Sequence, residues 1–427
     1  MINGAHISPL DAAAVLIVLS ALLGYFNFRF LKLPPSVGLT IMGAIASLIV
    51  VGIDMVLPGS QIGAEIADYI ASIDFHATLM DGMLSFLLFA GALHVDWHDM
   101  KRGAVPIILL STIGVVFSTL LIGSGFLWLT AAIGFSVPFV WCLVFGALIS
   151  PTDPVAVMGV LKRAKVSPTL EATVAGESLF NDGVGVVIFT ILLATALGNE
   201  PFSWARAVHL FFIEAGGGVL LGLAVGWIGY RAMRSIDEYK LEVLISLAIV
   251  MGGYTIAHWI HVSGPVAMAV AGLLIGNEGV ATAMSETTRD YLLKFWALID
   301  DILNTVLFVL IGLEVVTIPK DTRLIVLGLA AVPLVLAART ISVSGPLVAL
   351  RPLLNLGPLA LPTLIWGGLR GGISIALALG LPDGPGRSIL LAATYIVVLF
   401  SVIGQGGTIA RLLDWLTKRT AKQDVVR

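Results

Sequence analysis

The chain has 427 residues, of which 58% are hydrophobic and 12% are charged, and its formal net charge is −3. Soluble domains average about 45–50% apolar and about 25% charged residues, so this composition excludes an ordinary water-soluble fold. The 24 Lys and Arg lie between apolar runs rather than in one patch, which argues against a nucleic-acid partner.

Thirteen apolar runs follow one another along the chain. A bilayer core about 30 Å thick requires roughly 20 residues of helix, and the runs have this length without the alternating polarity of membrane β-strands. The first run has no basic segment before it, which favours a retained helix over a signal peptide. We therefore expect an all-α membrane protein with about 13 transmembrane helices, near 11–29, 35–56, 77–95, 104–132, 138–160, 171–198, 205–230, 241–260, 263–279, 291–315, 322–349, 357–381 and 386–414.

The joints between these runs differ in their content of Lys and Arg. Positive residues are retained on the cytoplasmic side of a membrane. Because alternate joints lie on the same side, we count Lys and Arg separately for the two sets of alternate joints. One set, with the tail, carries 18: Arg29, Lys32, Lys101, Arg102, Lys162, Arg163, Lys165, Arg231, Arg234, Lys240, Arg289, Lys294, Arg351, Arg411, Lys418, Arg419, Lys422 and Arg427. The other carries 4: Arg206, Lys320, Arg323 and Arg387. The asymmetry predicts an external N-terminus and a cytoplasmic C-terminus.

Several charged residues fall inside the apolar runs. A charge at the centre of a bilayer costs at least about 2.5–3.5 kcal/mol, so each one needs a partner, a water-filled cavity or a function. These residues form the functional shortlist: Asp153, Glu177, Asp182, Glu214, Asp300, Asp301, Arg339 and Arg370.

The fifth run contains the segment GALISPTDPVAVMG, in which Pro151 and Pro154 flank Thr152 and Asp153. A proline removes a backbone donor and clashes with the preceding turn, so two prolines three residues apart predict an interrupted helix. Backbone carbonyls freed near the middle of the membrane are cation ligands. The alternative is a structural kink at which Asp153 caps the second half of the helix.

The sixth run contains VAGESLFNDGVGVVIF. Ser178 and Asp182 are four residues apart, as are Glu177 and Asn181, which predicts that all four polar groups share a side of the helix that does not face lipid. A carboxylate beside a serine hydroxyl, facing a break rich in carbonyls, is a hard-oxygen site for a small dehydrated cation. A buried carboxylate with a structural role alone is the alternative for Asp182.

Charged residues also occur in the tenth and eleventh runs. Asp300 and Asp301, in FWALIDDILNTVLF, lie a few turns inside the cytoplasmic end of their helix and either line an ion funnel or are solvated at the helix end. Arg339, in VPLVLAARTISVSG, needs a partner from another helix, and we expect a structural ion pair with Glu177.

Four glycines bracket Arg370 in IWGGLRGGISIALALG, the twelfth run. Glycine lowers helix stability, so this segment predicts a second interrupted helix whose cation faces the acidic site of the first. Paired interrupted helices in the two ends of a chain point to a transporter with inverted repeats. Close helix packing by glycine is the alternative.

These motifs resemble those of the monovalent cation:proton antiporters, in particular the NhaP-like sodium/proton exchangers. The resemblance covers nearly the whole chain and rests on PTDP, ESLFNDG, LFVLIGLEV from Leu307 onward, and GGLRGG. It implies that Asp182 is the ion- and proton-binding carboxylate, with Asp153, Thr152 and Ser178 beside it. It also implies supporting roles for the adjacent Asn181 and for the pair of Glu177 and Arg339.

The resemblance further implies a homodimer that is divided into a transport core and an interface. The core would comprise residues 104–200 and 319–415, which hold helices 4–6 and 11–13. The interface would comprise 1–103, with helices 1–3, and 201–318, with a linker helix and helices 7–10. Residues 416–427 would form a short cytoplasmic tail.

The expected function is secondary active antiport rather than enzymatic catalysis, with no resident cofactor. Na⁺ or Li⁺ would exchange for H⁺ across the cell's inner membrane by alternating access, with both substrates competing for Asp182. We expect electroneutral exchange, because Asn181 stands where electrogenic relatives have a second aspartate. A K⁺/H⁺ exchanger or a cation channel with the same carboxylates remains open, because hard-oxygen ligands suit these cations alike.

An intramembrane aspartyl protease is a remote alternative from another class, since two aspartates on adjacent helices can activate water. Enzymes of that class carry a Y-D motif and a G-x-G-D motif. Here Asp153 follows Thr152 and Asp182 follows Asn181, so neither motif is present at these positions.

Overall fold

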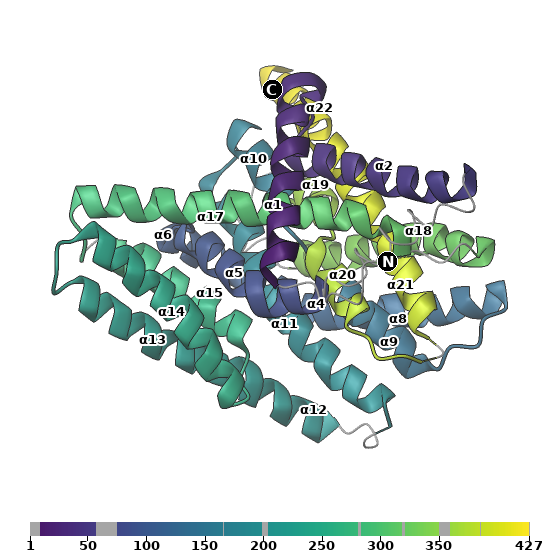
Figure 1. Cartoon of the computed structure of the whole chain (residues 1–427), viewed down its shortest axis with the longest axis horizontal. Coiled ribbons are helices and arrows are strands. Elements are labelled where there is room, and N and C mark those ends of the chain that lie inside the picture. Colours follow the sequence, from purple (N-terminus) through teal and green to yellow (C-terminus); the bar gives the residue numbers. More distant parts are fainter. Residues whose placement is uncertain are drawn as a thin grey trace.

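The computed structural model describes residues 9–56, 75–164, 166–198, 204–280, 283–317, 321–349, 359–384 and 386–426, and these form helices without a strand (Figure 1). The helices of the first half are α1 (Pro9–Phe26), α2 (Pro35–Val56), α4 (Phe75–Ala77), α5 (Leu84–Leu93), α6 (Trp97–Arg102), α7 (Ala104–Ser111), α8 (Ile113–Ile133), α9 (Phe139–Ile149), α10 (Val155–Ala164) and α11 (Pro168–Ala196). Those of the second half are α12 (Trp204–Phe211), α13 (Gly217–Met233), α14 (Tyr239–Trp259), α15 (Gly264–Leu274), α17 (Glu286–Leu313), α18 (Thr322–Ala349), α19 (Ala360–Trp366), α20 (Gly372–Leu379), α21 (Arg387–Leu399) and α22 (Gly406–Val426).

Short π-helical or 3₁₀ segments continue several of these helices. They are η1 (Asn27–Leu31), η2 (Thr78–Met83), η3 (Phe212–Gly216), η4 (Ile275–Gly279), η5 (Glu314–Thr317) and η7 (Phe400–Gln405). Lys165, Lys320, Arg351 and Arg427, which enter the charge comparison above, lie outside the described residues.

The thirteen expected spans correspond to these helices. Among the described residues, nine helical stretches are long and apolar enough to cross a membrane, and each coincides with an expected span. The other four spans correspond to α2, to α9 with α10, to α15 with η4, and to α19 with α20. The all-α membrane fold with two interrupted helices is therefore confirmed.

Two of the helices, α11 and α17, begin three or more residues earlier than the apolar runs predict. α17 begins at Glu286 rather than near 291, because the side chain of Ser285 accepts a hydrogen bond from the Thr288 amide. α11 begins at Pro168 rather than near 171, because Ser167 caps the Leu170 amide. Such caps stabilise polar first turns that hydropathy alone does not detect.

The main core lies where α8, α9, α17, α18, α20 and α21 pack together. The rings of Phe126 on α8 and Phe145 on α9 stack with their centroids 4.0 Å apart. Glycine permits close helix contact elsewhere, as its G-x-x-x-G spacing predicts. A Cβ at Gly222 of α13 would collide with the Ala267 carbonyl of α15, and one at Gly276 with the Leu93 carbonyl of α5.

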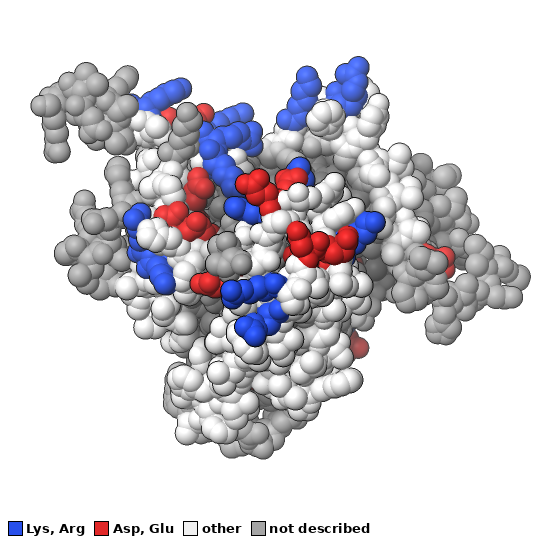
Figure 2. All heavy atoms as spheres, turned by 90° about the vertical axis from the view of Figure 1, so that its left-hand side faces the viewer, with Lys and Arg blue, Asp and Glu red and all other residues white. Residues whose placement is uncertain are grey.

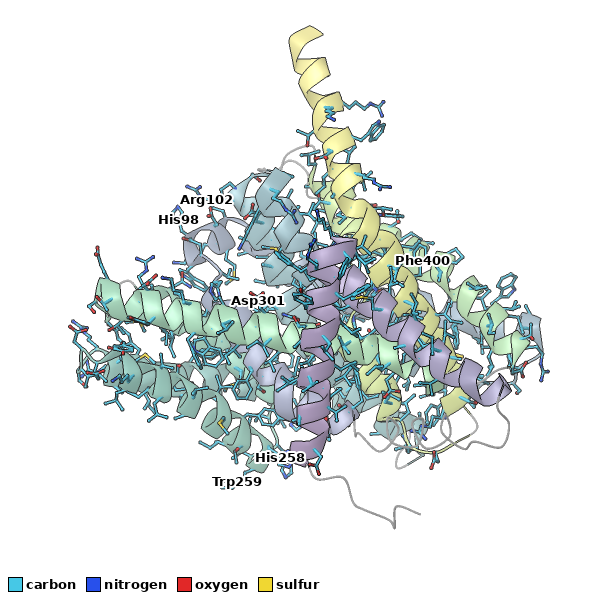
Figure 3. The ribbon with its side chains drawn as sticks, turned by 45° about the horizontal axis from the view of Figure 1, so that its top comes forward. His98, Arg102, His258, Trp259, Asp301 and Phe400 are labelled. Atoms are coloured by element: carbon cyan, nitrogen blue, oxygen red, sulfur yellow. The ribbon has the colours of Figure 1, made fainter. Side chains whose placement is uncertain are left out.

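Charged side chains gather at one end of the bundle. The left-hand side of Figure 1, where α6 lies and α17 begins, is turned toward the viewer in Figure 2 and carries many Lys, Arg, Asp and Glu. Figure 3 places His98 and Arg102, at α6, well away from His258 and Trp259, at the far end of α14, with Asp301 between them in that view. Arg102, in one of the positive joints counted from the sequence, thus lies at this charged end.

Candidate functional site

The first interrupted helix breaks between α9 and α10. α9 ends at Ile149, and α10 begins at Val155, so the two prolines of the break stand at Pro151 and Pro154, as the sequence predicts. The Asp153 amide donates to the Leu369 carbonyl over 2.8 Å, and Asp153 Oδ1 accepts from the Val155 amide over 2.9 Å. Asp153 therefore caps α10 at the break, as the capping interpretation predicts, and its role as an ion ligand stays a prediction.

The second interrupted helix breaks between α19 and α20, and it crosses the first. Asp153 and Leu369 form an isolated antiparallel bridge at the crossing point. A Cβ on Gly371 would collide with the Asp153 carboxylate, so the close approach of the two breaks requires glycine there. An antiparallel crossing of this kind is what inverted repeats produce in transporters.

An arginine satisfies the carbonyls at each break. Nη1 of Arg370 donates to the carbonyl oxygens of Ser150 and Pro151, over 2.5 and 3.0 Å, at the end of α9. Arg339 donates through Nε and Nη2 to the Leu364 carbonyl, over 3.1 and 2.7 Å, in the last turn of α19. A cation at a helix C-terminus offsets the helix dipole and the unpaired carbonyls together.

This contact revises one expectation about the first break. The carbonyls freed by the break were expected to be cation ligands, but Arg370 donates to two of them, those of Ser150 and Pro151. Arg370 was expected to face the acidic site, and its guanidinium instead contacts the carbonyl end of α9. Its own amide donates to Ser401 Oγ over 2.8 Å, which holds the break in place.

The polar residues of α11 point to two different neighbours. Glu177, Ser178, Asn181 and Asp182 are all buried, as expected for a side that does not face lipid. Asn181 Oδ1 accepts from the Thr152 amide over 3.2 Å, and Asn181 Nδ2 donates to Thr152 Oγ1 over 2.7 Å. Thr152 Oγ1 also lies 3.1 Å from Ser178 Oγ. These contacts fasten α11 to the first break directly beside Asp182.

The predicted ion pair of Glu177 and Arg339 is present. Nη1 and Nη2 of Arg339 donate to the two carboxylate oxygens of Glu177 over 2.5 and 3.0 Å. Both side chains are buried, and the remaining donors of Arg339 reach the Leu364 carbonyl. The pair is bidentate, and each nitrogen of the guanidinium has an acceptor, which is the geometry that makes a buried ion pair tolerable.

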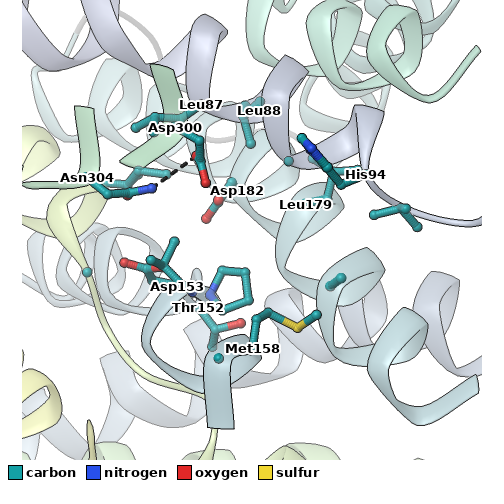
Figure 4. Close-up of a pocket in the computed structure, with 18 of the residues that line it drawn as sticks. Leu87, Leu88, His94, Thr152, Asp153, Met158, Leu179, Asp182, Asp300 and Asn304 are labelled. Atoms are coloured by element: carbon teal, nitrogen blue, oxygen red, sulfur yellow. Dashed lines mark hydrogen bonds between the residues drawn. The ribbon is translucent and has the colours of Figure 1, made fainter. Parts of the chain in front are cut away.

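A cavity of about 540 Å³ leads to the two aspartates of the crossing region. Asp153, Thr152 and Asp182 line it, together with Asp300 and Asn304 of α17, as Figure 4 shows. Its lining continues to residues at the charged face, namely His94, Asp96, Asp99, Lys162 and Glu171. Asp182 is therefore reached from the end of the bundle that carries the positive joints.

Asp300 and Asp301 both line this cavity, in agreement with the funnel interpretation. Asp300 is half-buried, and its Oδ1 accepts from Asn304 Nδ2 over 3.0 Å, whereas Asp301 is exposed. Carboxylates along the walls of a cleft raise the local concentration of cations. Glu214, in η3, lies outside the lining.

Sequence reasoning missed other residues of the lining. Asn304, Glu171 and His94 line the cavity, as does Ser374 in the first turn of α20. Asn304 stands four residues after Asp300 on a helix, a spacing that signals a side-chain contact. His94 and Glu171 lie near span ends, where polar residues are common and carry little signal.

The described residues contain no cluster of three His, Cys, Asp or Glu side chains that would hold a resident metal ion. At the crossing of the two breaks, two carboxylates line the cavity, Asp153 and Asp182. The Thr152 hydroxyl also belongs to a residue of the lining, and it lies 3.1 Å from the Ser178 hydroxyl. Oxygen ligands of this kind suit a hard monovalent cation.

Comparison with known proteins identifies relatives over nearly the whole chain. A family model described as "Sodium/hydrogen exchanger, transmembrane" matches residues 17–415. The chain is 46% identical over 414 residues to the Na⁺/H⁺ antiporter NhaP of Pseudomonas aeruginosa, with 95% of this chain and 96% of that protein covered. It is 34% identical over 402 residues to the Na⁺/H⁺ antiporter NhaH of Halobacillus aidingensis, with 91% and 93% covered.

The fold also matches a solved structure. The sodium proton antiporter MjNhaP1 from Methanocaldococcus jannaschii, at pH 8, superposes with a TM-score of 0.73 at 20% identity. The match covers 93% of this chain and 98% of that one. The two chains therefore share one helical architecture.

Proposed function

The chain belongs to the family of transmembrane sodium/hydrogen exchangers, and from this premise we propose that it is a secondary antiporter that exchanges Na⁺ for H⁺. One observation carries the proposal: Asp182 is buried at a cavity that leads to the charged face, and it has no ion-pair partner among the described residues. A buried carboxylate without a fixed cation binds a mobile one, either a proton or a metal ion.

Sodium and the proton compete for Asp182 under this proposal. Na⁺ binds the ionised carboxylate, and protonation neutralises the same group, so one substrate displaces the other. Asp153, Thr152 and Ser178 supply further oxygens beside it. Li⁺ has the same ligand preferences and is a second substrate.

Electroneutral exchange of one proton for one sodium is part of the proposal. Asn181 is a neutral amide whose oxygen and nitrogen both contact Thr152, so it positions the break and carries no proton. The carboxylate of Glu177 is held by Arg339 in a bidentate pair, so it has a fixed partner in place of a mobile ion. Asp182 then carries a single compensating charge in either direction.

Alternating access follows from the position of the cavity. The cavity connects Asp182 with the charged face, where Lys162 and Asp99 lie. On the other side of Asp182, the main core is closely packed. An empty, ionised site is too costly to carry across the membrane, which couples the two ion movements. Contacts of Arg370 with Ser150 and of Arg339 with Glu177 support a transport core formed by residues 104–200 and 319–415.

The membrane arrangement completes the proposal. We assign the open face to the cytoplasm of the cell's inner membrane, with the N-terminus outside, because the positive joints lie there. Exposed apolar side chains on α1, α13 and α14 support contact with lipid and with a second copy of the chain through segments 1–103 and 201–318. Labelling of single cysteines at the termini of intact cells tests this orientation, and a tail accessible only from outside contradicts it.

Proteoliposomes with an internal pH-sensitive dye test the function. Addition of NaCl or LiCl to vesicles that hold a pH gradient should move protons, whereas choline chloride should not. The same assay with KCl distinguishes a K⁺/H⁺ exchanger. A channel is distinguished because it passes the cation without any proton movement. Absence of sodium-dependent proton movement in the wild-type protein contradicts the proposal.

A further inference from the structure

The hydroxyl of Ser374 is a buried polar group without a partner. The residue is 1% exposed, and its Oγ makes no hydrogen bond among the described residues. Most buried hydroxyls in proteins are paired, since an unpaired one loses its hydration with no bond in return. A specific unpaired group of this kind needs an explanation, and a bound water molecule or ion that completes its contacts is one.

Ser374 lies where the second interrupted helix meets the site. It occupies the first turn of α20, three residues after Gly371, the residue that directly precedes this helix. The backbone at Gly371 is in close contact with the Asp153 carboxylate. Ser374 also lines the cavity together with Asp153 and Asp182. The residue with the free hydroxyl is thus part of the wall around the two aspartates and not at a distant point of the core.

The other hydroxyls of the site are already engaged. Thr152 Oγ1 receives a hydrogen bond from Asn181 Nδ2 and lies 3.1 Å from Ser178 Oγ, so these two hydroxyls interact with each other. Ser20, Ser85 and Thr363 also have buried oxygens without partners, but none of them lines the cavity. Among the described residues, Ser374 alone combines a free hydroxyl with a place in the cavity wall.

We propose that Ser374 Oγ is an additional oxygen ligand of the transported sodium, contributed by the second interrupted helix. A hydroxyl oxygen offers the hard lone pairs that a dehydrated monovalent cation requires. The proposal rests on the proposed sodium/proton exchange and adds to it. The site would then take ligands from both interrupted helices and from α11, rather than from the first break and α11 alone.

The ligand affects the two substrates differently. Na⁺ needs several oxygens around it, whereas a proton on Asp182 needs one carboxylate oxygen. Loss of the Ser374 hydroxyl should therefore weaken sodium binding and leave proton binding nearly unchanged. A structural role for Ser374 would instead alter folding or the maximal rate.

Sodium-dependent thermal stabilisation measures the binding step without transport. The full chain in detergent is heated with increasing NaCl at an alkaline pH, with choline chloride to hold the ionic strength constant. A ligand that binds only the folded state stabilises it by RT ln(1 + [L]/Kd), so the rise of the melting temperature with NaCl concentration gives the Kd for sodium. Ser374→Ala should raise this Kd about three- to tenfold, the usual effect of one lost polar contact.

Matched variants separate ligation from packing. Ser85→Ala removes an equally buried, unpaired hydroxyl outside the cavity and should behave as wild type. Ser374→Thr keeps the hydroxyl and should retain sodium affinity, and Ser374→Cys keeps the size with a poorer ligand should the alanine variant fail to fold. In proteoliposomes, Ser374→Ala should raise the half-saturating Na⁺ concentration with little change in the rate at saturation.

The outcomes distinguish this inference from the proposed function. If the wild type exchanges sodium for protons while Ser374→Ala and Ser85→Ala have the same half-saturating Na⁺ concentration, Ser374 is not a ligand and the antiport proposal stands. If the wild type shows neither sodium-dependent stabilisation nor sodium-dependent proton movement, both proposals are wrong.

Discussion

Two carboxylates on one helix, Glu177 and Asp182 of α11, have opposite surroundings. Glu177 is held by both Nη atoms of Arg339, in a region where each nitrogen of the guanidinium has an acceptor. Asp182 lies beside a cavity and has no ion-pair partner among the described residues. Both residues are buried, at 1% and 7% exposure, so burial does not distinguish them.

The difference shows that the partner, rather than depth in the membrane, decides what a buried charge does. A saturated ion pair stabilises one arrangement of helices and has no capacity for a mobile ion. An unpaired carboxylate at a cavity must find its cation in solution. We therefore expect changes at Glu177 to affect folding and changes at Asp182 to affect transport.

The largest effect should come from Asp182→Asn. The amide has the same shape and cannot bind a proton or balance a sodium charge, so we expect sodium-driven proton movement in proteoliposomes to fall to background. Its melting temperature should stay near that of wild type, because no ion pair is lost. Persistent exchange in this variant would remove Asp182 from its central role.

Removal of either partner of the ion pair should have the next largest effect. Glu177→Ala or Arg339→Ala leaves the other charge buried and unpaired, at a cost of about 3–5 kcal/mol, so folded yield and melting temperature should drop. Size-exclusion chromatography and thermal melting measure both quantities.

A double variant that removes both charges serves as the control for this pair. Replacement of both charges, as Glu177→Leu with Arg339→Met, should recover part of the stability, because no unpaired charge remains. If both single variants fold normally and change only the cation preference, the structural interpretation of the pair is wrong.

A smaller effect is expected for Asp300→Asn, which removes a charge from the cavity wall. Fewer cations would gather in the cavity, so the half-saturating Na⁺ concentration should rise about twofold at low ionic strength and return toward wild type at high salt. Asp290→Asn is the matched control, since Asp290 is an exposed residue of the same helix that pairs with Lys294 outside the cavity. An equal effect of both variants would argue against a funnel.

We expect the membrane potential to have no effect on the rate of exchange. If Asp182 carries either one proton or one sodium while Glu177 stays paired, each cycle moves no net charge. A potential imposed on proteoliposomes with K⁺ and valinomycin should leave the rate of sodium-driven proton movement unchanged. A steep dependence would show that a second proton moves and that another group, such as Asp153, titrates with Asp182.

Much of the fold could be predicted from the sequence, because lipid imposes a simple length rule on apolar runs. The two interrupted helices were predictable as well, since Pro151, Pro154 and the glycines around Arg370 act on their own helices. The pairing of Glu177 with Arg339 followed from the cost of leaving either charge alone. In each case a local residue type or a large energy determines the outcome.

The contacts that join distant segments could not be predicted in this way. Arg370 donates to carbonyls more than 200 positions earlier in the chain, and backbone carbonyls have no signature in a sequence. The two hydrogen bonds between Asn181 and Thr152 were unpredictable for the same reason. The spacing of residues within α11 carries no information about the break that follows α9. The free hydroxyl of Ser374 is visible only as the absence of a contact.

The bridge between Asp153 and Leu369 has a consequence for the timescale of motion at the crossing. Its single amide hydrogen bond is the backbone link between the two breaks among the described residues. If the two breaks move together as one rigid body, the hydrogen bond from the Asp153 amide to Leu369 stays intact throughout the transport cycle. Its deuterium exchange should then be slow and the same with and without sodium, while amides that border the cavity gain protection when the ion binds.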